Sequence, residues 1–253
     1  ALCAAICETV RANPGARVVK MSGYFASVEI DVVPVDNRVS IAIAAYHPKH
    51  DIVDRLPRPG PAKVHQVKLW IEKLRANRRD DIVPPQVKVS ANYASPMTAK
   101  ARAQAAGYDE IVLVDEDGHL AEGPTTNLFL VDQDGCLLTP KSEKVLHGVT
   151  RSAIMEIAKA EGIEIREAAL KPDALLNASE AFLTGTNAGV WPVESVDGHR
   201  LGEQCPGPIA QRLSDRFRRA VTGQDSEFEH WLTPIEDGSC LATLSPNKTI
   251  NRS

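Results

Sequence analysis

Residues 111–138 read IVLVDEDGHLAEGPTTNLFLVDQDGCLL, and this stretch decides the fold class. It contains short apolar runs separated by the pairs Asp117-Gly118 and Asp134-Gly135, and the runs are residues 111–114, 128–131 and 137–138. Asp-Gly pairs favour the tight turns of β-hairpins, because glycine readily adopts the positive φ that these turns need. The stretch therefore predicts a β-meander, in which each strand pairs with the next one along the chain.

Regular elements are expected on both sides of this stretch. Helical composition covers residues 94–106, which end at Gly107, and residues 150–159, which are closed by Gly162. Glycine is a common residue just beyond a helix end. The other expected elements are short strands at 87–89, 181–184 and 190–193, a helix at 208–221, a helix at 2–12, and β-like runs at 16–30 and 38–46. This mixture of hairpins and helices predicts an α+β fold and not a doubly wound parallel sheet.

The domain organisation is predicted from residues 55–61, RLPRPGP, which contain three prolines and one glycine and form the best linker candidate. The composition changes across this segment, from a small β-rich part to a longer part that mixes helices and strands. We therefore expect a small first domain with its linker at residues 1–61, a larger domain at residues 62–223, and a C-terminal tail at residues 224–253.

Composition and charge exclude several classes of function. The chain has 43% hydrophobic and 25% charged residues, as globular proteins do, and its net charge of -4 gives no footprint for nucleic acid. No apolar run reaches the length of a membrane span. The five cysteines form no C-x-x-C pair, so we expect neither a disulfide framework nor a metal site. These features predict a cytoplasmic protein without nucleic-acid or membrane partners.

Four stretches carry the candidate chemistry, and they are KVSANY at residues 88–93, GYDE at 107–110 with EGPTTN at 122–127, LHGVTR at 146–151, and ASEAF at 178–182 with TGT at 184–186. In their order and spacing they resemble the class IV, or fold type IV, pyridoxal-phosphate enzymes. Within this group the chain looks most like the branched-chain amino-acid aminotransferases, from about residue 2 to about Pro234. The resemblance implies the D-amino-acid aminotransferase-like fold and pyridoxal 5'-phosphate as cofactor, bound in the larger domain.

The resemblance implies roles for three side chains around the cofactor ring. Lys88, placed at the end of the expected strand 87–89, would bind the cofactor covalently and move the proton at the substrate α-carbon. Tyr93 would hydrogen-bond the ring oxygen, and Glu122 would keep the ring nitrogen protonated. Without the resemblance, Lys88 is interpreted as a surface lysine, Tyr93 as a packed aromatic residue, and Glu122 as an exposed acid in a turn.

Five further residues are implied to hold the cofactor phosphate. Gly148, Val149 and Thr150 stand at the start of the expected helix 150–159, and a helix N-terminus offers N–H donors and a favourable dipole to an anion. Gly185 and Thr186 resemble the second phosphate contact of the family, at the end of a strand. The plainer interpretations are a helix cap at Thr150 and an ordinary loop at residues 185–186.

The sequence departs from the family pattern in three places. Family members carry several dozen residues, including an arginine that grips the phosphate, before the helix that here begins at Leu2; we therefore expect a truncated first domain, weak cofactor binding and aggregation. In VVKMSGYF, residues 18–25, Lys20 stands where branched-chain enzymes have the arginine of Tyr-x-Arg-Pro. A lysine is not an equivalent fork for a carboxylate. Residues 235–253 have no counterpart in the family.

The resulting hypothesis is an aminotransferase that moves an amino group between leucine, isoleucine or valine and 2-oxoglutarate. The resemblance also implies a homodimer or a larger homo-oligomer. D-amino-acid aminotransferase and aminodeoxychorismate lyase activities share the cofactor and stand as alternatives, as does a fragment that folds without turning over. Asn92-Tyr93 and Glu122-Gly123-Pro124 look more like the branched-chain group.

Overall fold

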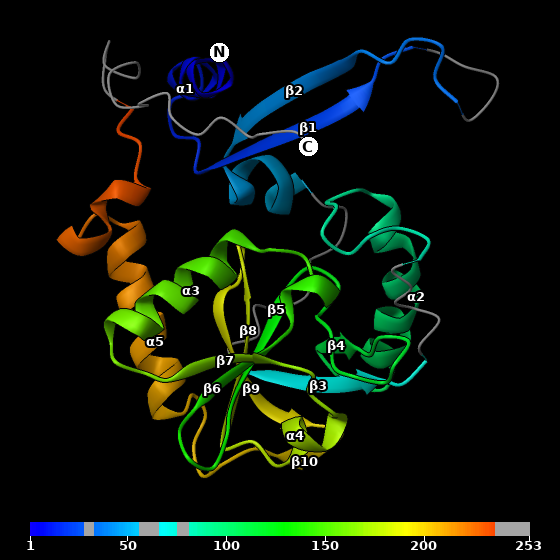
Figure 1. Cartoon of the computed structure of the whole chain (residues 1–253). Helices are drawn as coiled ribbons and strands as arrows, with labels where there is room; N and C mark the ends of the chain where they lie inside the picture. The colour runs from blue at the N-terminus through cyan, green and yellow to red at the C-terminus, as the bar shows by residue number, and fades with distance from the viewer. Residues whose placement is uncertain (28–32, 56–65, 75–80, 236–253) are drawn as a thin grey trace, which may run out of the picture. The chain divides into compact units, whose positions relative to one another are not determined.

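The computed structural model describes residues 1–27, 33–55, 66–74 and 81–235 of the chain (Figure 1). The chain divides into two compact units, one made of Ala1–Ala62 with His230–Ser253 and one made of Lys63–Glu229. Each unit is described by itself. Among the described helices, none is long and apolar enough to cross a membrane.

The first unit contains one helix and one hairpin. The helix α1, Leu2–Arg11, precedes the strands β1, Val18–Phe25, and β2, Val39–Tyr46. The two strands pair antiparallel, from Val18 opposite Tyr46 to Phe25 opposite Val39. Two short helical turns follow, η1 at Pro48–Ile52 and η2 at Val53–Arg55. The helix and both β-runs expected here are present with shorter strands, and residues 28–30 of the first run lie outside the described residues.

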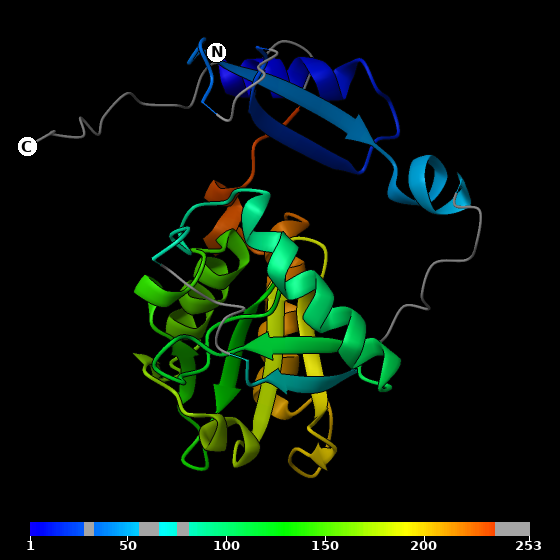
Figure 2. The same cartoon turned by 90° about the vertical axis from the view of Figure 1, so that its right-hand side faces the viewer.

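The second unit is built around an eight-stranded mixed sheet with the order β4-β3-β9-β8-β5-β6-β7, and β10 pairs with β9 (Figure 2). The pairs β3–β4, β3–β9 and β6–β7 are parallel, and the other pairs are antiparallel. The strands are β3 at Val67–Glu72, β4 at Glu110–Leu113, β5 at Asn127–Val131, β6 at Leu137–Pro140, β7 at Ile165–Ala168, β8 at Glu180–Gly185, β9 at Gly189–Val196 and β10 at His199–Arg200.

Helices cover this sheet. They are α2 at Ala91–Ala105, α3 at Val149–Ala160, α4 at Pro172–Leu176 and α5 at Pro208–Val221, with the short turns η4 at Ser142–Lys144 and η5 at Ser226–Trp231. α2 packs on β4, whereas α3 and α5 pack on each other and on β8 (Figure 1). The expected helices correspond to α2, α3 and α5, although α2 begins three residues earlier than expected. The sequence does not predict β3, β7 or α4.

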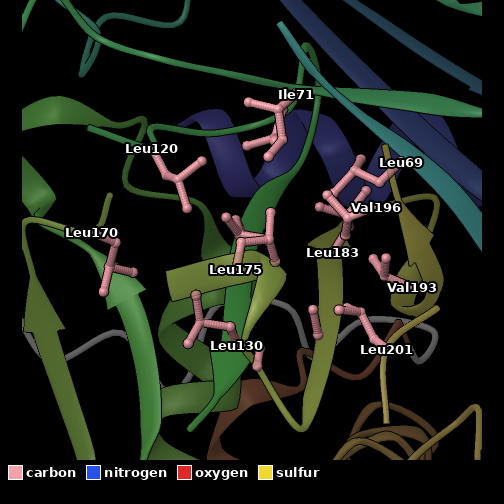
Figure 3. Packing of buried hydrophobic residues seen from close by; sticks show 14 of the residues in the cluster. Leu69, Ile71, Leu120, Leu130, Leu170, Leu175, Leu183, Val193, Val196 and Leu201 are labelled. Carbon is pink, nitrogen blue, oxygen red and sulfur yellow. The ribbon is translucent and has the colours of Figure 1, made fainter. Parts of the chain in front are cut away.

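Side chains alternate along β5 and β8 and so separate two apolar layers. Leu130 and Leu183 point into the main core, where they meet Leu175 of α4 (Figure 3). Phe129 and Phe182 are fully buried and stack with their ring centroids 5.2 Å apart. They lie on the other face, because successive residues of a strand point to opposite faces. Asn127 and Thr184, which are paired in register at one end of β5 and β8, share this phenylalanine face.

The predicted β-meander is wrong in its first pairing. β5 and β6 do form a hairpin across Asp134-Gly135, where Gly135 has a φ of +83°. β4, however, pairs with β3, and the turn at Asp117-Gly118 closes only a short hairpin through the bridge between Val114 and Leu120. The cause is a non-local partner. β3 lies about forty residues earlier in the chain and offers β4 a parallel pairing that the local turn signals do not reveal.

The short strand expected at residues 87–89 is also absent, because this segment forms turns. The N–H of Val87 donates to Pro84 O at 3.1 Å, and the N–H of Val89 donates to Val87 O at 3.0 Å. The valines favour a strand by propensity, but here local hydrogen bonds occupy the backbone groups that a ladder would use. Lys88 therefore lies in a turn that leads into α2 and not at the end of a strand.

Candidate active site

A cavity of about 340 Å³ lies in the second unit, where the polar end of the phenylalanine face meets the start of α3. This volume lies in the usual range for small-molecule sites. All eight residues singled out from the sequence line it, and they are Lys88, Tyr93, Glu122, Gly148, Val149, Thr150, Gly185 and Thr186. The fold thus brings four separate segments of the chain to one place.

Lys88 and Tyr93 form one side of the cavity. The Nζ of Lys88 donates a hydrogen bond to the Tyr93 hydroxyl at 3.1 Å and lies 5.7 Å from the centre of the Tyr93 ring. The amide of Asn92, which also lines the cavity, donates to Val87 O at 3.0 Å. This contact ties the turn that carries Lys88 to the first turn of α2. The exposed amine therefore has a defined neighbour and a backbone that is held next to it.

Glu122 is buried, with 8% of its surface exposed, so the interpretation as an exposed acid in a turn does not hold. Its Oε2 accepts hydrogen bonds from Asn127 Nδ2 and from the N–H of Leu146, both at 3.0 Å. Hydrogen bonds donated to a carboxylate favour its ionised form. The cavity wall therefore contains a negatively charged oxygen pair that the protein itself supports.

The start of α3 forms another part of the wall. Gly148 is the N-cap residue, and no side chain caps this helix. Thr150 is the second helical residue and is buried, so the plainer interpretation of Thr150 as the cap is not what the structure shows. The first N–H groups of a helix lack partners within the helix and carry the positive end of its dipole. An anion in the cavity would meet these groups.

Three glycines make room for the side chains of the wall. A Cβ at Gly148 would lie 2.1 Å from Asn127 Oδ1, and a Cβ at Gly123 would lie 2.3 Å from Thr126 Oγ1. A Cβ at Gly185 would lie 3.2 Å from Thr125 O. The sequence suggests that Gly148 allows an anion to approach. The structure adds a second reason, which is that the neighbouring asparagine needs the space.

Two functional candidates are not predicted from the sequence. In the described part of the chain, four buried side-chain polar atoms have no hydrogen-bond partner, and Thr126 Oγ1 and Thr184 Oγ1 are two of these. Both residues line the cavity. A buried hydroxyl without a partner costs about 1–3 kcal/mol, so such atoms point to a polar ligand. The available sequence signal was that Thr184 lies two residues before Thr186 and so shares its side of the chain.

The arrangement offers a distinct set of chemical groups to one small molecule. Lys88 contributes an amine that can attack a carbonyl, and Glu122 contributes a carboxylate that can hold a proton on a ligand nitrogen. The start of α3 and the hydroxyls around it can bind an anionic group such as a phosphate. These groups line a single cavity, so one ligand can meet all of them.

Comparison with known proteins gives a family match over most of the chain. The model of the amino-transferase class IV family matches residues 4–196. The branched-chain-amino-acid aminotransferase of Salmonella typhimurium is 39% identical over 154 residues, which cover 60% of this chain and 50% of that protein. The enzyme of the same name from Pseudomonas aeruginosa is 32% identical over 151 residues, covering 60% and 49%. The chain spans about half the length of these curated relatives.

Solved structures show the same likeness in three dimensions. The branched-chain aminotransferase of the archaeon Thermoproteus uzoniensis, solved with norvaline, has a TM-score of 0.79 and 30% identity, covering 92% of this chain and 74% of that one. A second branched-chain amino acid aminotransferase, from the source abbreviated T.th., was solved in complex with N-(5'-phosphopyridoxyl)-L-glutamate. It also has a TM-score of 0.79, with 34% identity and the same coverage.

The unpartnered hydroxyl of Thr184 gives a prediction with a definite sign. Thr184→Val replaces a fully buried hydroxyl that has no partner by a methyl group of the same shape. We expect the ligand-free protein to gain about 1–2 kcal/mol in its free energy of unfolding, because the desolvation penalty disappears. The measurement is urea-induced unfolding of the ligand-free chain.

Thr139→Val is the matched control. Thr139 is equally buried, on β6, but its hydroxyl donates to Leu128 O at 2.8 Å. Its loss should lower the free energy of unfolding by about 1 kcal/mol, because Leu128 O is left without this donor. Equal losses in both variants would show that the Thr184 hydroxyl has a partner in the ligand-free protein.

Proposed function

Because the chain belongs to the class IV aminotransferases, we propose that it acts as a pyridoxal-phosphate-dependent transaminase. The family and the α+β fold of type IV pyridoxal-phosphate enzymes are both confirmed as the sequence predicted them. The activity and the residue roles are the proposal. The observation that carries it is one cavity lined by an amine, a buried carboxylate and a helix start that no side chain caps.

The residues present fit this cofactor. It has an aldehyde for the Lys88 amine, a ring nitrogen for Glu122, and a phosphate for the start of α3. Thr126 and Thr184 support the fit, because their buried hydroxyls have no partner and await a polar group. When bound, the cofactor supplies an electron sink that weakens the bonds at the substrate α-carbon.

Lys88 has two tasks in this proposal. It binds the cofactor covalently between turnovers, and its released amine takes the proton from the substrate α-carbon and later returns it. The Tyr93 hydroxyl, 3.1 Å from Nζ, orients the amine. The turn around Lys88 is held to α2 through Asn92, which keeps the amine on one side of the cavity.

Glu122 holds a proton on the ring nitrogen. Its two N–H donors favour the ionised carboxylate, and an ionised carboxylate is the partner that a protonated ring nitrogen needs. The phosphate is bound by Gly148, Val149 and Thr150 at the start of α3. Gly185 and Thr186, at the end of β8, line the same cavity and supply the second contact.

The proposed substrates are leucine, isoleucine or valine and 2-oxoglutarate. The names of the curated relatives support the first group. One solved relative contains norvaline, an apolar amino acid, and another contains a cofactor adduct of glutamate, the amino acid that 2-oxoglutarate becomes. The same proposal includes a cytoplasmic location and a homodimer or larger homo-oligomer, as the resemblance of the sequence implies.

The role of Lys88 predicts a site of covalent attachment. Borohydride treatment of the chain loaded with pyridoxal 5'-phosphate should fix the cofactor on the peptide that contains Lys88, as read by mass spectrometry. Lys88→Ala should lose both the label and amino transfer. Lys159→Ala, which removes an exposed lysine from the last turn of α3, should keep the label at Lys88. Label on another lysine would contradict the assignment.

The role of Glu122 predicts a defect in turnover and not in attachment. Glu122→Gln should still bind the cofactor through Lys88, but turnover should fall roughly a hundredfold, in the range that a lost proton partner usually costs. Glu143→Gln, which neutralises an exposed carboxylate in η4, is the control and should leave turnover unchanged. Near-normal turnover by Glu122→Gln would remove Glu122 from the proposed site.

The substrate proposal predicts preference for branched-chain L-amino acids. The chain loaded with cofactor should transfer the amino group of L-leucine to 2-oxoglutarate faster than that of D-alanine. A faster reaction with D-alanine, or pyruvate release from aminodeoxychorismate, would instead favour one of the two alternatives of the same fold. Covalent attachment at Lys88 without turnover of any substrate would favour the non-catalytic alternative.

A further inference from the structure

The side-chain amide of Asn127 has an unusual number of contacts for a residue that the proposed chemistry does not use. Asn127 is the first residue of β5 and is buried, with 6% of its surface exposed. Its Nδ2 donates to Glu122 Oε2 at 3.0 Å and to Leu146 O at 2.9 Å. The N–H of Leu146 donates to the same Glu122 oxygen at 3.0 Å. One amide nitrogen therefore joins the carboxylate to the segment that leads into α3.

The oxygen end of the same amide lies against the start of α3. Gly148, the N-cap residue, approaches Asn127 Oδ1 so closely that an added Cβ would be only 2.1 Å away. The N–H of Gly148 donates to Leu146 O at 2.8 Å, so this carbonyl has two donors. With no side-chain cap on α3, these contacts position its first residues relative to the sheet.

We propose that Asn127 is a positioning residue that sets the spacing between the Glu122 carboxylate and the N-terminus of α3. This inference rests on the proposed function, in which the two groups receive the two ends of one cofactor. A rigid ring with a phosphate arm fixes the distance between these ends. A site for it therefore needs one part of the protein that holds both partners, and the Asn127 amide contacts both.

The alternative is that Asn127 only stabilises the fold, as buried hydrogen-bonding residues commonly do. The two interpretations differ in what a substitution changes. A stabilising role lowers the free energy of unfolding and leaves the properties of bound cofactor as they were. A positioning role also changes the ring end and the phosphate end of the site together, because both depend on the same side chain.

The test compares pyridoxal 5'-phosphate with pyridoxal, which lacks the phosphate, on the full chain. The ratio of the two dissociation constants reports the phosphate end, and the pH dependence of the absorption of bound cofactor reports the ring end. Asn127→Ala should weaken pyridoxal 5'-phosphate binding about ten- to a hundredfold, the usual effect of losing hydrogen bonds to a charged group. It should also lower the ratio and shift the absorption profile in the direction seen for Glu122→Gln.

Controls separate this outcome from a loss of stability. Thr139→Val removes a buried hydrogen bond on β6 and should change neither the ratio nor the absorption profile. In the double variant Glu122→Gln/Asn127→Ala, the second substitution should add little to the absorption shift, because Asn127 acts there through Glu122. Should Asn127→Ala fail to fold, Asn127→Asp keeps the shape without the donors, and Gly148→Ala displaces the amide from the other side.

Each result decides between the two interpretations. A wild-type chain that binds neither pyridoxal nor its phosphate would overturn the proposed function, and this inference with it. Normal wild-type binding, combined with Asn127 and Gly148 variants that keep the wild-type ratio and absorption profile, would overturn the positioning role alone. A change at only the ring end or only the phosphate end would also overturn it, because the proposal requires both ends to respond.

Discussion

The antiparallel register of β5 on β8 is the constraint on which the cavity depends. It places Phe129 opposite Phe182, and one step further along it places Asn127 opposite Thr184. A slip of one residue would turn the phenylalanines into the opposite layer and the leucines out of it, so the burial of both layers fixes the register. The apolar face then ends in two polar residues at the point where α3 begins. The site is thus the polar edge of a layer whose position the core has already set.

Polar groups at this edge fall into two kinds that differ in their partners. Glu122, which has to stay charged, receives two N–H donors from the protein and is supported before any ligand arrives. The hydroxyls of Thr126 and Thr184 are buried without partners, and no side chain caps α3. Unsatisfied groups of this kind lower the stability of the ligand-free protein and strengthen its binding of a ligand that satisfies them. The proposed cofactor would therefore contribute to the stability of the unit that binds it.

Local signals in the sequence predicted more of the molecule than non-local ones. The hairpin at Asp134-Gly135 and the helix α5 follow from residues next to each other in the chain, and both are present. β3 was missed because its pairing with β4 and β9 joins segments far apart in the sequence. The site shows the same division. The motif residues that the family resemblance indicated do line one cavity, whereas Asn127 and Thr184 become candidates only once the cross-strand pairing places them there.

The support beneath Lys88 differs from that beneath Glu122. Glu122 is tied to β5 and to the segment before α3, whereas Lys88 lies in a turn held by short-range bonds, among them those from Val89 and Asn92 to Val87 O. The sequence placed Lys88 at the end of a strand, where a sheet would aim it. A turn suits the proposed chemistry better, since the lysine must bind the cofactor, leave it and carry a proton, and each position needs a different reach. The carboxylate keeps one partner throughout and gains from a fixed support. The division between a locally held amine and a carboxylate fixed by the sheet thus follows from what each group has to do.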